Sequence, residues 1–422
     1  MAGLKILIVG SGGREHALYR ACTRSSRTSR VFVGPGNAGI PDCDRVALRE
    51  DDPAAVYAFS AGHGIDLVVI GPEAPLVGGL SDFLRERAIR VFGPSRTAAE
   101  LEGSKAFVAQ LCAERRIPAP RSHVATSFDE AARIINKTGY LVVKADGICA
   151  GKGVIVGDSV DEAVEAARSM LIAGAFGQAV AQIVIQERVC GVEASLLYFC
   201  DGWNLYPLPA AQDAKRALDG DQGPNTGGMG AFAPHPSITR LIEAQIASCI
   251  ARPAITHMRL KGTPFCGLLY VGVMLTPVGP KLIEFNARFG DPETQAVLPL
   301  VEDDIVRYLW ACSMTNGLNG LPRVTPKSGA TVCTVLASHG YPGPYQRDVP
   351  IHSADTDSEL AWLIHAGTRR RHDGQLMTSG GRVLAACGYG HTIAEAREHS
   401  LTLARKVAFH GKHHRSDIAA HV

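Results

Sequence analysis

A glycine-rich run from Lys144 to Gly153 has the composition of a loop that holds phosphate groups. The apolar stretch before it predicts a strand ending at Lys144, which would place this ammonium group at the edge of a sheet. Glycines let a backbone approach a polyphosphate, and lysines neutralise its charge; the run supplies Gly147, Gly151, Lys152 and Gly153. It is not a Walker loop, because Gly153 stands where Ser or Thr is required. A glycine-rich hairpin that binds nothing explains this run equally well.

A second run, from Glu284 to Glu293, supplies oxygen atoms and a guanidinium group. The alternation in Lys281–Asn286 predicts a strand that places Glu284 and Asn286 on one face. Two such oxygens suit Mg²⁺, which fills its other positions with water and phosphate. Arg288 follows on the same parity and would clamp a carboxylate or a phosphoryl group. A half-exposed strand explains this run alone equally well, but the two runs together favour a nucleotide and metal site.

A third glycine-rich loop, Gly10–Arg14, follows an apolar run and opens a predicted helix. Backbone amides and the helix dipole at such a position suit a phosphate. A dinucleotide fingerprint is disfavoured, because GxGxxG requires glycine where this chain has Glu15. We therefore expect a single phosphate here, and a tight turn that binds nothing is the alternative.

The elements around this loop predict a parallel sheet. Short apolar runs alternate with helical segments, and each run ends in a loop that contains glycine; the runs are Lys5–Val9, Val31–Val33, Ile65–Ile70 and Arg90–Phe92. Such alternation is typical of a doubly wound α/β sheet. Ligands bind at the carboxyl ends of its strands, so the glycine loops are candidates for binding.

The rest of the chain continues to alternate. A helix is expected over 97–115, and strands are expected over 141–144, 154–156, 183–185, 194–198, 268–275 and 281–284. The polar stretch 212–236 has little periodicity, and its length favours a binding loop. A helix is expected over 237–260. A separate C-terminal module is indicated by strands over 330–336 and 381–386 and a helix over 393–407. A solvated basic tail is expected to carry His410, His413, His414 and His421.

Composition narrows the class of protein. The chain has 422 residues, 46% of them hydrophobic, and a net charge of +2, which favours neither nucleic acid nor an anionic membrane as a partner. No apolar run is long enough to cross a bilayer, and the N-terminus lacks the pattern of a signal peptide. The 11 cysteines are an odd number without tight spacing, which is typical of a reduced compartment. We expect a cytoplasmic enzyme or binding protein.

Motifs of one family run through nearly the whole chain in the family's order. They are 12–16, 35–39, 71–76, 101–107, 144–147, 150–155, 223–230, 283–295 and 380–384. On these residues the chain resembles the glycinamide ribonucleotide synthetases, also called phosphoribosylamine–glycine ligases, which are ATP-grasp enzymes of purine biosynthesis. The runs 223–230 and 283–295 are highly specific together.

The resemblance implies an α/β and α+β multidomain fold. An N-terminal doubly wound parallel sheet would occupy 1–103 and receive the substrate phosphate. A central ATP-grasp fold would occupy 104–325, with a mobile subdomain at about 121–189. A small α+β domain would occupy 326–422, and the protein would be a monomer.

The resemblance also implies a reaction in which ATP is a co-substrate and Mg²⁺ or Mn²⁺ is the metal. Glycine would attack the γ-phosphate of ATP through its carboxylate, giving glycyl phosphate and ADP. The amine of 5-phosphoribosylamine would then displace phosphate and give glycinamide ribonucleotide. No covalent enzyme intermediate is needed, so the cysteines need no catalytic role.

Residue roles follow from the resemblance. ATP would contact Lys105, Lys144, Gly151, Lys152, Gly153, Glu187, the backbone of Val189, and Glu193. The metal ligands would be Glu284 and Asn286. Glycine and its acyl phosphate would be oriented by Arg288, Asp213 and Lys215. The sugar-phosphate substrate would contact Gly12, Gly13, Arg14, Gly71, Pro72 and Glu73. Substrate would also be bound by Asp291 and, on the long loop that closes the site, by Asn225 and Thr226.

Two places depart from the family pattern. Ala214 stands where a basic residue or histidine is common, and the hinge over 186–193 contains Arg188 and Cys190. Three alternatives are weighed against the resemblance. The 223–230 loop disfavours a biotin or purine carboxylase, and the broken GxGxxG disfavours a nicotinamide-dependent oxidoreductase. A non-catalytic ATP sensor is disfavoured by the retention of Lys144, Glu284, Asn286 and Arg288.

Overall fold

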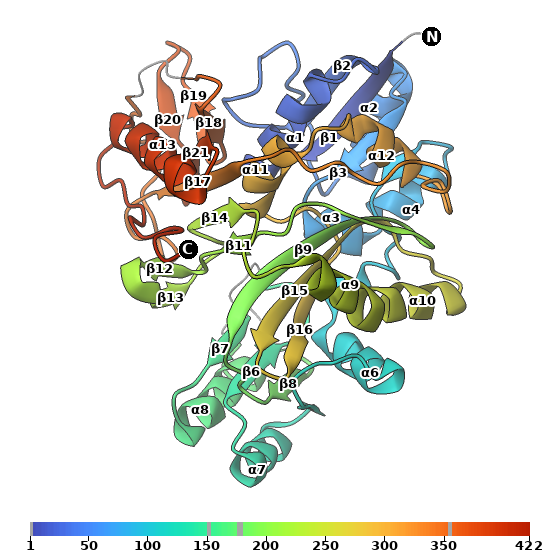
Figure 1. Cartoon of the computed structure of the whole chain (residues 1–422), viewed down its shortest axis with the longest axis vertical. Coiled ribbons are helices and arrows are strands. Elements are labelled where there is room, and N and C mark those ends of the chain that lie inside the picture. Colours follow the sequence, from blue (N-terminus) through green and yellow to red (C-terminus); the bar gives the residue numbers. More distant parts are fainter. Residues whose placement is uncertain (1–2, 150–152, 175–179, 353–356) are drawn as a thin grey trace.

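The computed structural model describes residues 3–149, 153–174, 180–352 and 357–422. Figure 1 shows an N-terminal region in blue beside a C-terminal region in red, with the central part of the chain below them in cyan, green and yellow. Among the described residues, no helix is both long enough and apolar enough to cross a membrane.

The N-terminal sheet confirms the expected doubly wound arrangement. Its parallel strands lie in the order β2-β1-β3-β4 and comprise β1 (Leu4–Gly10), β2 (Thr28–Pro35), β3 (Leu67–Ile70) and β4 (Val91–Phe92). The helices of this region are α1 (Gly13–Thr23), α2 (Pro53–His63), α3 (Glu73–Gly78) and α4 (Leu80–Arg85). The order reverses between β1 and β3, so the loops that follow these two strands emerge side by side.

The central part contains two sheets. The smaller has the order β5-β8-β6-β7 and comprises β5 (Ser122–Ala125), β6 (Val142–Ala145), β7 (Val154–Val156) and β8 (Ile183–Gln186). With α7 (Phe128–Thr138) and α8 (Val160–Leu171) it encloses a hydrophobic core of its own. We call this unit the small lobe (Figure 1).

The larger central sheet has the order β10-β9-β15-β16 and is antiparallel. It comprises β9 (Val192–Asp201), β10 (Leu205–Pro207), β15 (Cys266–Thr276) and β16 (Gly279–Asn286). Its apolar residues share one core with the N-terminal sheet and with α6 (Lys105–Arg115), α9 (Arg240–Ile246) and α10 (Arg252–Leu260). The N-terminal region and this sheet are therefore packed as one body.

The C-terminal sheet has the order β11-β14-β17-β21-β18. Its own strands are β17 (Ala330–Ala337), β18 (Ala361–His365) and β21 (Arg382–Gly390), next to the hairpin β19 (Thr368–Arg370) and β20 (Leu376–Thr378) and helix α13 (Ile393–Lys406). Two strands come from the central part of the chain: β11 (Gln212–Asp213) and β14 (Gly230–Ala233). The helices α11 (Glu293–Val297) and α12 (Ile305–Ala311) lead into this region.

The expectation that 212–236 has no regular secondary structure was wrong, whereas its role in binding stays a prediction. Besides β11 and β14, the stretch contains a hairpin of β12 (Arg216–Leu218) and β13 (Gln222–Asn225). These strands have two to four residues each, which is too short to give a visible hydrophobic period. Their backbone groups pair instead with each other and with β17, which is distant in sequence.

Other expectations need smaller corrections. The helix expected over 97–115 is interrupted at Ser104, whose backbone is extended and whose hydroxyl caps α6 by accepting from Phe107 N–H. The helix expected over 237–260 begins only at Arg240, after the capping residue Thr239. The C-terminal tail is partly packed rather than solvated, because His413 Nε2 lies 2.7 Å from the Ala217 carbonyl oxygen of β12.

Candidate active site

Two lysines lie where the small lobe meets the larger sheet and α6. Lys144 lies in β6, and its Nζ donates to the Ile283 carbonyl oxygen of β16 at 3.1 Å. Burial lowers the pKa of Lys144 to about 8, although Glu284 opposes this shift. Lys105 begins α6 and donates through Nζ to the Gly147 carbonyl oxygen at 2.8 Å. Two ammonium groups thus lie where the sequence predicts ATP phosphates.

The glycine-rich loop is described only in part. Gly151 and Lys152, which we expected to contact phosphates, lie outside the described residues. Gly153 is buried, and a Cβ atom at this position would lie 2.6 Å from the Cys149 side chain. Only glycine therefore fits at position 153 without displacing the loop.

The predicted metal ligands lie on β16. Glu284 and Asn286 are separated by one residue on this strand, whose register shifts between its pairs Leu282–Val273 and Glu284–Gly272. Lys215 lowers the pKa of Glu284 to about 2, against the effect of burial. Glu284 is therefore ionised at neutral pH, and among the described residues the Asn286 side-chain amide makes no hydrogen bond. An anionic oxygen beside a free amide oxygen fits a hard divalent cation.

Lys215 links this strand to the predicted ribose contact. Its Nζ lies 3.2 Å from Glu193 Oε2 and 3.4 Å from Glu284 Oε1. Burial alone would lower the pKa of Lys215, but the two carboxylates raise it well above its usual range. The structure thus brings five predicted site residues into one charged cluster: Lys105, Lys144, Glu193, Lys215 and Glu284.

The predicted adenine contacts lie on the connection between β8 and β9. The Glu187 carboxylate accepts from the Arg121 backbone N–H at 3.2 Å and lies 4.0 Å from Lys281 Nζ. Val189 follows in the same half-buried segment. The unfamiliar Arg188 points to the small lobe, where its Nη1 lies 2.9 Å from Asp158 Oδ1. The connection therefore borders both sheets, as a hinge for a nucleotide base would.

Arg288 is held by two carboxylates. Its guanidinium lies 3.2 Å from Glu73 Oε2 and 2.9 Å from Glu102 Oε1. Burial alone would lower the pKa of Arg288, but Glu102 and Glu73 raise it. Glu73 is the first residue of α3, directly after the loop that follows β3, so this ion pair joins the N-terminal region to the segment after β16.

The loop after β1 differs from the free phosphate cradle that its sequence predicted. The Gly12 N–H donates to Glu15 Oε2 at 2.6 Å, and Arg14 Nε donates to Glu15 Oε1 at 2.6 Å. A Cβ atom at Gly71 would lie 2.0 Å from Glu15 Oε1, so this carboxylate lies tightly under both loops. The sequence argument treated Glu15 only as a break in a glycine motif, whereas its carboxylate binds the donors expected to hold phosphate.

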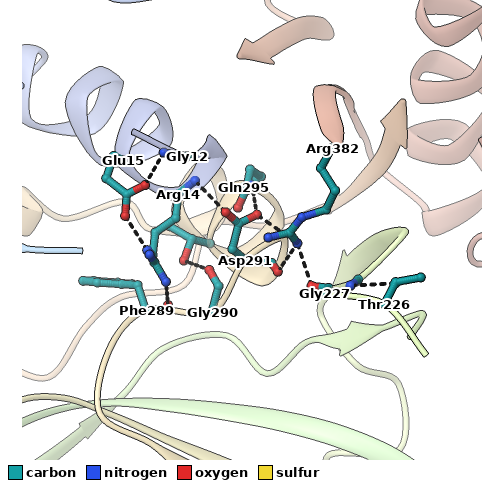
Figure 2. A network of polar contacts seen from close by, with 12 residues as sticks. Gly12, Arg14, Glu15, Thr226, Gly227, Phe289, Gly290, Asp291, Gln295 and Arg382 are labelled. Carbon is teal, nitrogen blue, oxygen red and sulfur yellow. Dashed lines mark hydrogen bonds and ion pairs between the residues drawn. The ribbon is translucent and has the colours of Figure 1, made fainter. Parts of the chain in front are cut away.

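Predicted substrate contacts at the start of α1 lie near Asp291. Figure 2 shows Asp291 between Arg14, Gln295 and Arg382. Its Oδ2 accepts from Arg14 N–H at 3.4 Å, and its Oδ1 accepts from Gln295 Nε2 at 2.8 Å. Gly13 lies nearby at the start of α1, where a Cβ atom would lie 2.6 Å from Gln295 Nε2. Pro72 is the residue that precedes α3.

Arg382 is a site residue that the sequence argument did not single out. From the start of β21 its Nη1 donates to the Gly227 and Asp291 carbonyl oxygens, at 2.6 Å each (Figure 2). The signal was an arginine directly after Gly380 and Gly381, inside a motif that carried the resemblance. Its contacts bring the C-terminal sheet to the 226–230 loop and to the segment after β16.

The two predicted loop contacts are consecutive residues with different partners. Thr226 is buried, donates through its hydroxyl to the Lys215 carbonyl oxygen at 2.8 Å, and accepts from Gly228 N–H at 2.9 Å. Asn225 ends β13 and pairs with Arg216 of β12. Thr226 therefore fixes the backbone that carries Lys215, whereas Asn225 belongs to the hairpin.

These features define the class of protein. A small antiparallel lobe carries Lys144 and the glycine-rich loop, and it faces Glu284 on a second antiparallel sheet. Residues 103–294 match the family model of the phosphoribosylglycinamide synthetase ATP-grasp (A) domain. The central part is thus an ATP-grasp fold, as expected.

The neighbouring regions identify the family. Residues 4–102 match the N domain of phosphoribosylglycinamide synthetase, and residues 331–421 match its C domain. The chain belongs to the phosphoribosylglycinamide synthetase family. The boundaries expected at 103 and 325 stay predictions.

Relatives are similar over their whole length. Phosphoribosylamine–glycine ligase of Rhizobium meliloti (strain 1021) is 43% identical over 417 residues, which cover 98% of each chain. The ligase of Streptomyces coelicolor is 43% identical over 423 residues, which cover 99% of each chain. The crystal structure of phosphoribosylamine–glycine ligase from Thermotoga maritima has a TM-score of 0.82 at 33% identity and covers 98% of this chain and 100% of that one.

A likeness to carboxylases extends only to the fold. Biotin carboxylase from Campylobacter jejuni has a TM-score of 0.72, covering 97% of this chain and 92% of that one, at 12% identity. Such low identity shows a common architecture and says nothing about the substrate.

Proposed function

We propose that this protein joins glycine to 5-phosphoribosylamine at the expense of ATP, giving glycinamide ribonucleotide, ADP and phosphate in purine biosynthesis. The observation that carries the proposal is the membership of the whole chain in the phosphoribosylglycinamide synthetase family. It is supported by the charged cluster of Lys144, Lys215 and Glu284, which has the groups that phosphoryl transfer needs.

In the first step, a glycine carboxylate oxygen forms a bond to the γ-phosphorus of ATP. The bond from that phosphorus to the bridging oxygen breaks, and ADP leaves with the electron pair. Lys105 and Lys144 hold the phosphates and neutralise the developing charge. Arg288 orients the carboxylate of glycine, which requires it to loosen one contact with Glu73 or Glu102.

In the second step, the amine of 5-phosphoribosylamine attacks the carbonyl carbon of glycyl phosphate. The carbon–oxygen bond to phosphate breaks, phosphate leaves, and the new amide nitrogen loses a proton. Glycyl phosphate reacts rapidly with water, so the site must exclude solvent at this stage. Closure of the small lobe over the larger sheet is proposed to do so.

Glu284 and Asn286 are proposed to hold Mg²⁺ or Mn²⁺, which when bound would offset the negative charge of the ATP phosphates. Glu187 and the backbone of Val189 are proposed to contact adenine, and Glu193 the ribose. A cytoplasmic location and a monomeric state belong to the same proposal. The location rests on the cysteines, which are all described and all unpaired.

The proposal is tested by mixing the purified protein with ATP, Mg²⁺, glycine and 5-phosphoribosylamine, and detecting glycinamide ribonucleotide by mass spectrometry. Product is expected only when all of these components are present. Rapid ADP formation without glycine, or ATP turnover that depends on bicarbonate instead, would contradict the proposed function.

A further inference from the structure

His235 is a buried histidine outside the charged cluster of the candidate active site. It follows β14 after one residue, and it is 3% exposed. Its backbone N–H donates to the Ala210 carbonyl oxygen at 2.9 Å, which ties it to the segment between β10 and β11. Its ring Nε2 lies 3.2 Å from the Glu193 carbonyl oxygen on β9. His235 therefore joins two segments beside the residue that is the predicted ribose contact.

The proton of the His235 ring lies on Nε2. The Ser237 backbone N–H can only donate, and its nitrogen lies 3.1 Å from His235 Nδ1, so Nδ1 is the acceptor. Burial lowers the pKa of His235, so the ring is neutral at neutral pH. In a neutral ring the other nitrogen carries the hydrogen, and Nε2 therefore donates to the Glu193 carbonyl oxygen.

This bond continues a row of backbone hydrogen bonds along one edge of β9. Ser195 N–H donates to the Ala211 carbonyl oxygen at 2.8 Å, and Ala211 N–H donates to the Ser195 carbonyl oxygen at 2.9 Å. The carbonyl of Glu193, two residues earlier on the strand, points to the same side. After Ala211 the chain pairs with β14 instead, so no neighbouring strand continues the row there. The side chain of His235 supplies the donor in its place.

The Glu193 carboxylate belongs to the charged cluster. Its Oε2 lies 3.2 Å from Lys215 Nζ, which is also 3.4 Å from Glu284 Oε1. The side chain of Glu193 is 40% exposed, so a ligand can reach its carboxylate. Its position depends on Lys215 through the carboxylate and on His235 through the backbone. A small shift of this backbone would move the carboxylate away from a group bound beside it.

We propose that His235 is a positioning residue for the nucleotide: its Nε2–H fixes the Glu193 backbone and so places the Glu193 carboxylate to accept from the ribose hydroxyl groups of ATP. The inference rests on the proposed function, which gives Glu193 its contact with ribose, and it adds a residue that does not touch the nucleotide. Hydrogen bonds to a charged acceptor are stronger than those between neutral groups, and they depend on the position of that acceptor.

A role in folding alone is the competing explanation. His235 also lies in the connection from β14 to α9, and its ring is stacked near Phe232, with 6.2 Å between the ring centroids. Loss of a purely structural histidine would change the affinity for every nucleotide alike. Loss of a positioning residue that acts through Glu193 changes the affinity only for a nucleotide with ribose hydroxyl groups. A nucleotide without these groups therefore separates the two explanations.

The test compares ATP with 2′,3′-dideoxy-ATP, which lacks both ribose hydroxyl groups. Calorimetry on the full-length protein measures the dissociation constants of the two Mg²⁺ complexes, without glycine so that no ligation occurs. His235→Leu removes the Nε2 donor, and His235→Gln keeps an N–H donor on a side chain of similar reach. His399→Leu is the matched control, because His399 Nδ1 lies 2.7 Å from the Tyr389 carbonyl oxygen in the C-terminal region.

The wild-type protein is expected to bind ATP at least about 10-fold more tightly than dideoxy-ATP. His235→Leu should weaken ATP binding by about 10-fold and dideoxy-ATP binding by less than about two-fold. His235→Gln should keep ATP binding within about three-fold of the wild type. In turnover assays the loss in His235→Leu should appear in the KM for ATP, with kcat and the KM for glycine nearly unchanged. His399→Leu should change none of these values.

Glu193→Ala extends the test to the residue through which His235 acts. This variant should lose the preference for ATP over dideoxy-ATP by itself. Adding His235→Leu to Glu193→Ala should then weaken ATP binding by less than about two-fold, because the two residues act on the same contact.

Equal losses for ATP and dideoxy-ATP in His235→Leu would overturn the inference and indicate a structural role. Unchanged ATP affinity in His235→Leu would also overturn it, as would a His235→Gln variant that binds like His235→Leu, or additive losses in the double variant. Equal binding of the two nucleotides by the wild-type protein would overturn it without any variant. Failure of the proposed function is distinct, because the wild-type protein would then form no glycinamide ribonucleotide, whereas the calorimetric comparison needs no product.

Discussion

At the scale of single residues, the charge of Glu284 is set by lysines from three different segments. Lys215 lowers its pKa most, and Lys144 and Lys105 add to this. The lysines in turn depend on Glu284, which raises the pKa of Lys215 and opposes the fall in that of Lys144. Loss of the Glu284 side chain should therefore affect activity more than folding.

Glu284→Ala is expected to lower kcat by about 1000-fold or more, because it removes a charged metal ligand and leaves the lysines without a counter-charge. The temperature of thermal unfolding should change little, since the side chain is 38% exposed. Steady-state assays over a range of Mg²⁺ concentrations, with circular dichroism, measure both. Full activity of the variant at low Mg²⁺ would contradict the metal assignment.

Glu50 gives a prediction about pH. Its Oε1 accepts from Ser11 Oγ at 3.4 Å beside the loop after β1, and burial, followed by Glu15, raises its pKa from 4.5 to about 7. Between these two pH values the folded state keeps a proton that the unfolded state releases. The contribution of Glu50 to the free energy of unfolding is therefore fully present below pH 4.5 and is lost as the pH rises through about 7.

Glu50→Gln removes this titration. The variant should melt roughly 2 °C higher than the wild type at about pH 8 and with little difference at about pH 4.5. Scanning calorimetry at the two pH values measures these melting temperatures. Glu302→Gln is the control, because Glu302 is exposed. A variant that melts lower than the wild type at about pH 8 would disprove the interpretation.

At the scale of elements, the sequence predicted best the long helices with a repeated apolar pattern and the strands with an unbroken apolar run. The buried strands β1 and β3 and the C-terminal helix α13 lie near where the pattern placed them. The strands between Gln212 and Ala233 were missed because they are very short and pair with each other, and because the partner of β14 outside this stretch, β17, is distant in sequence. The contact between Glu15 and the Gly71 loop was also missed, since it arises only when β1 and β3 become neighbours.

The hairpin of β12 and β13 is fixed by the C-terminal tail. Arg415 is buried, and its guanidinium lies 2.6 Å from Asp221 and 2.7 Å from Asp417 and donates to the Arg216 carbonyl oxygen at 3.2 Å. Ser416 adds hydrogen bonds to Asp219. The hairpin leads directly to Thr226, so its order bears on the backbone that carries Lys215.

Arg415→Ala should therefore raise hydrogen exchange in β12 and β13 by about 10-fold or more, because it removes the ion pair to Asp221 and the hydrogen bond to the Arg216 carbonyl oxygen that hold the hairpin. The measurement is hydrogen exchange followed by mass spectrometry of peptides over 212–236. Arg405→Ala is the control, since Arg405 and its partner Glu398 are mostly exposed. Equal exchange in both variants would contradict the role given to the tail.

At the scale of the whole molecule, the small lobe stands apart in its packing. Its core comprises apolar residues between Ala125 and Ile185, whereas the N-terminal sheet shares its cores with the larger sheet and with the C-terminal region. A unit with a separate core can move and unfold by itself. This supports the proposed mobile subdomain at about 121–189.

Scanning calorimetry is expected to show two unfolding transitions, one at a lower temperature for the small lobe and one at a higher temperature for the rest of the protein. A Mg²⁺ complex of an ATP analogue should raise the lower transition by several degrees, because it binds the lobe only when the lobe is folded. A single transition that the nucleotide shifts as a whole would contradict an independent lobe.

The central claim is that the charged cluster around Glu284 activates the carboxylate of glycine. The most direct measurement uses glycine labelled with ¹⁸O in its carboxylate, together with ATP and 5-phosphoribosylamine, and analyses the released phosphate by mass spectrometry. The account predicts that each phosphate formed with glycinamide ribonucleotide carries one ¹⁸O atom from glycine. Unlabelled phosphate accompanying the same product would contradict it.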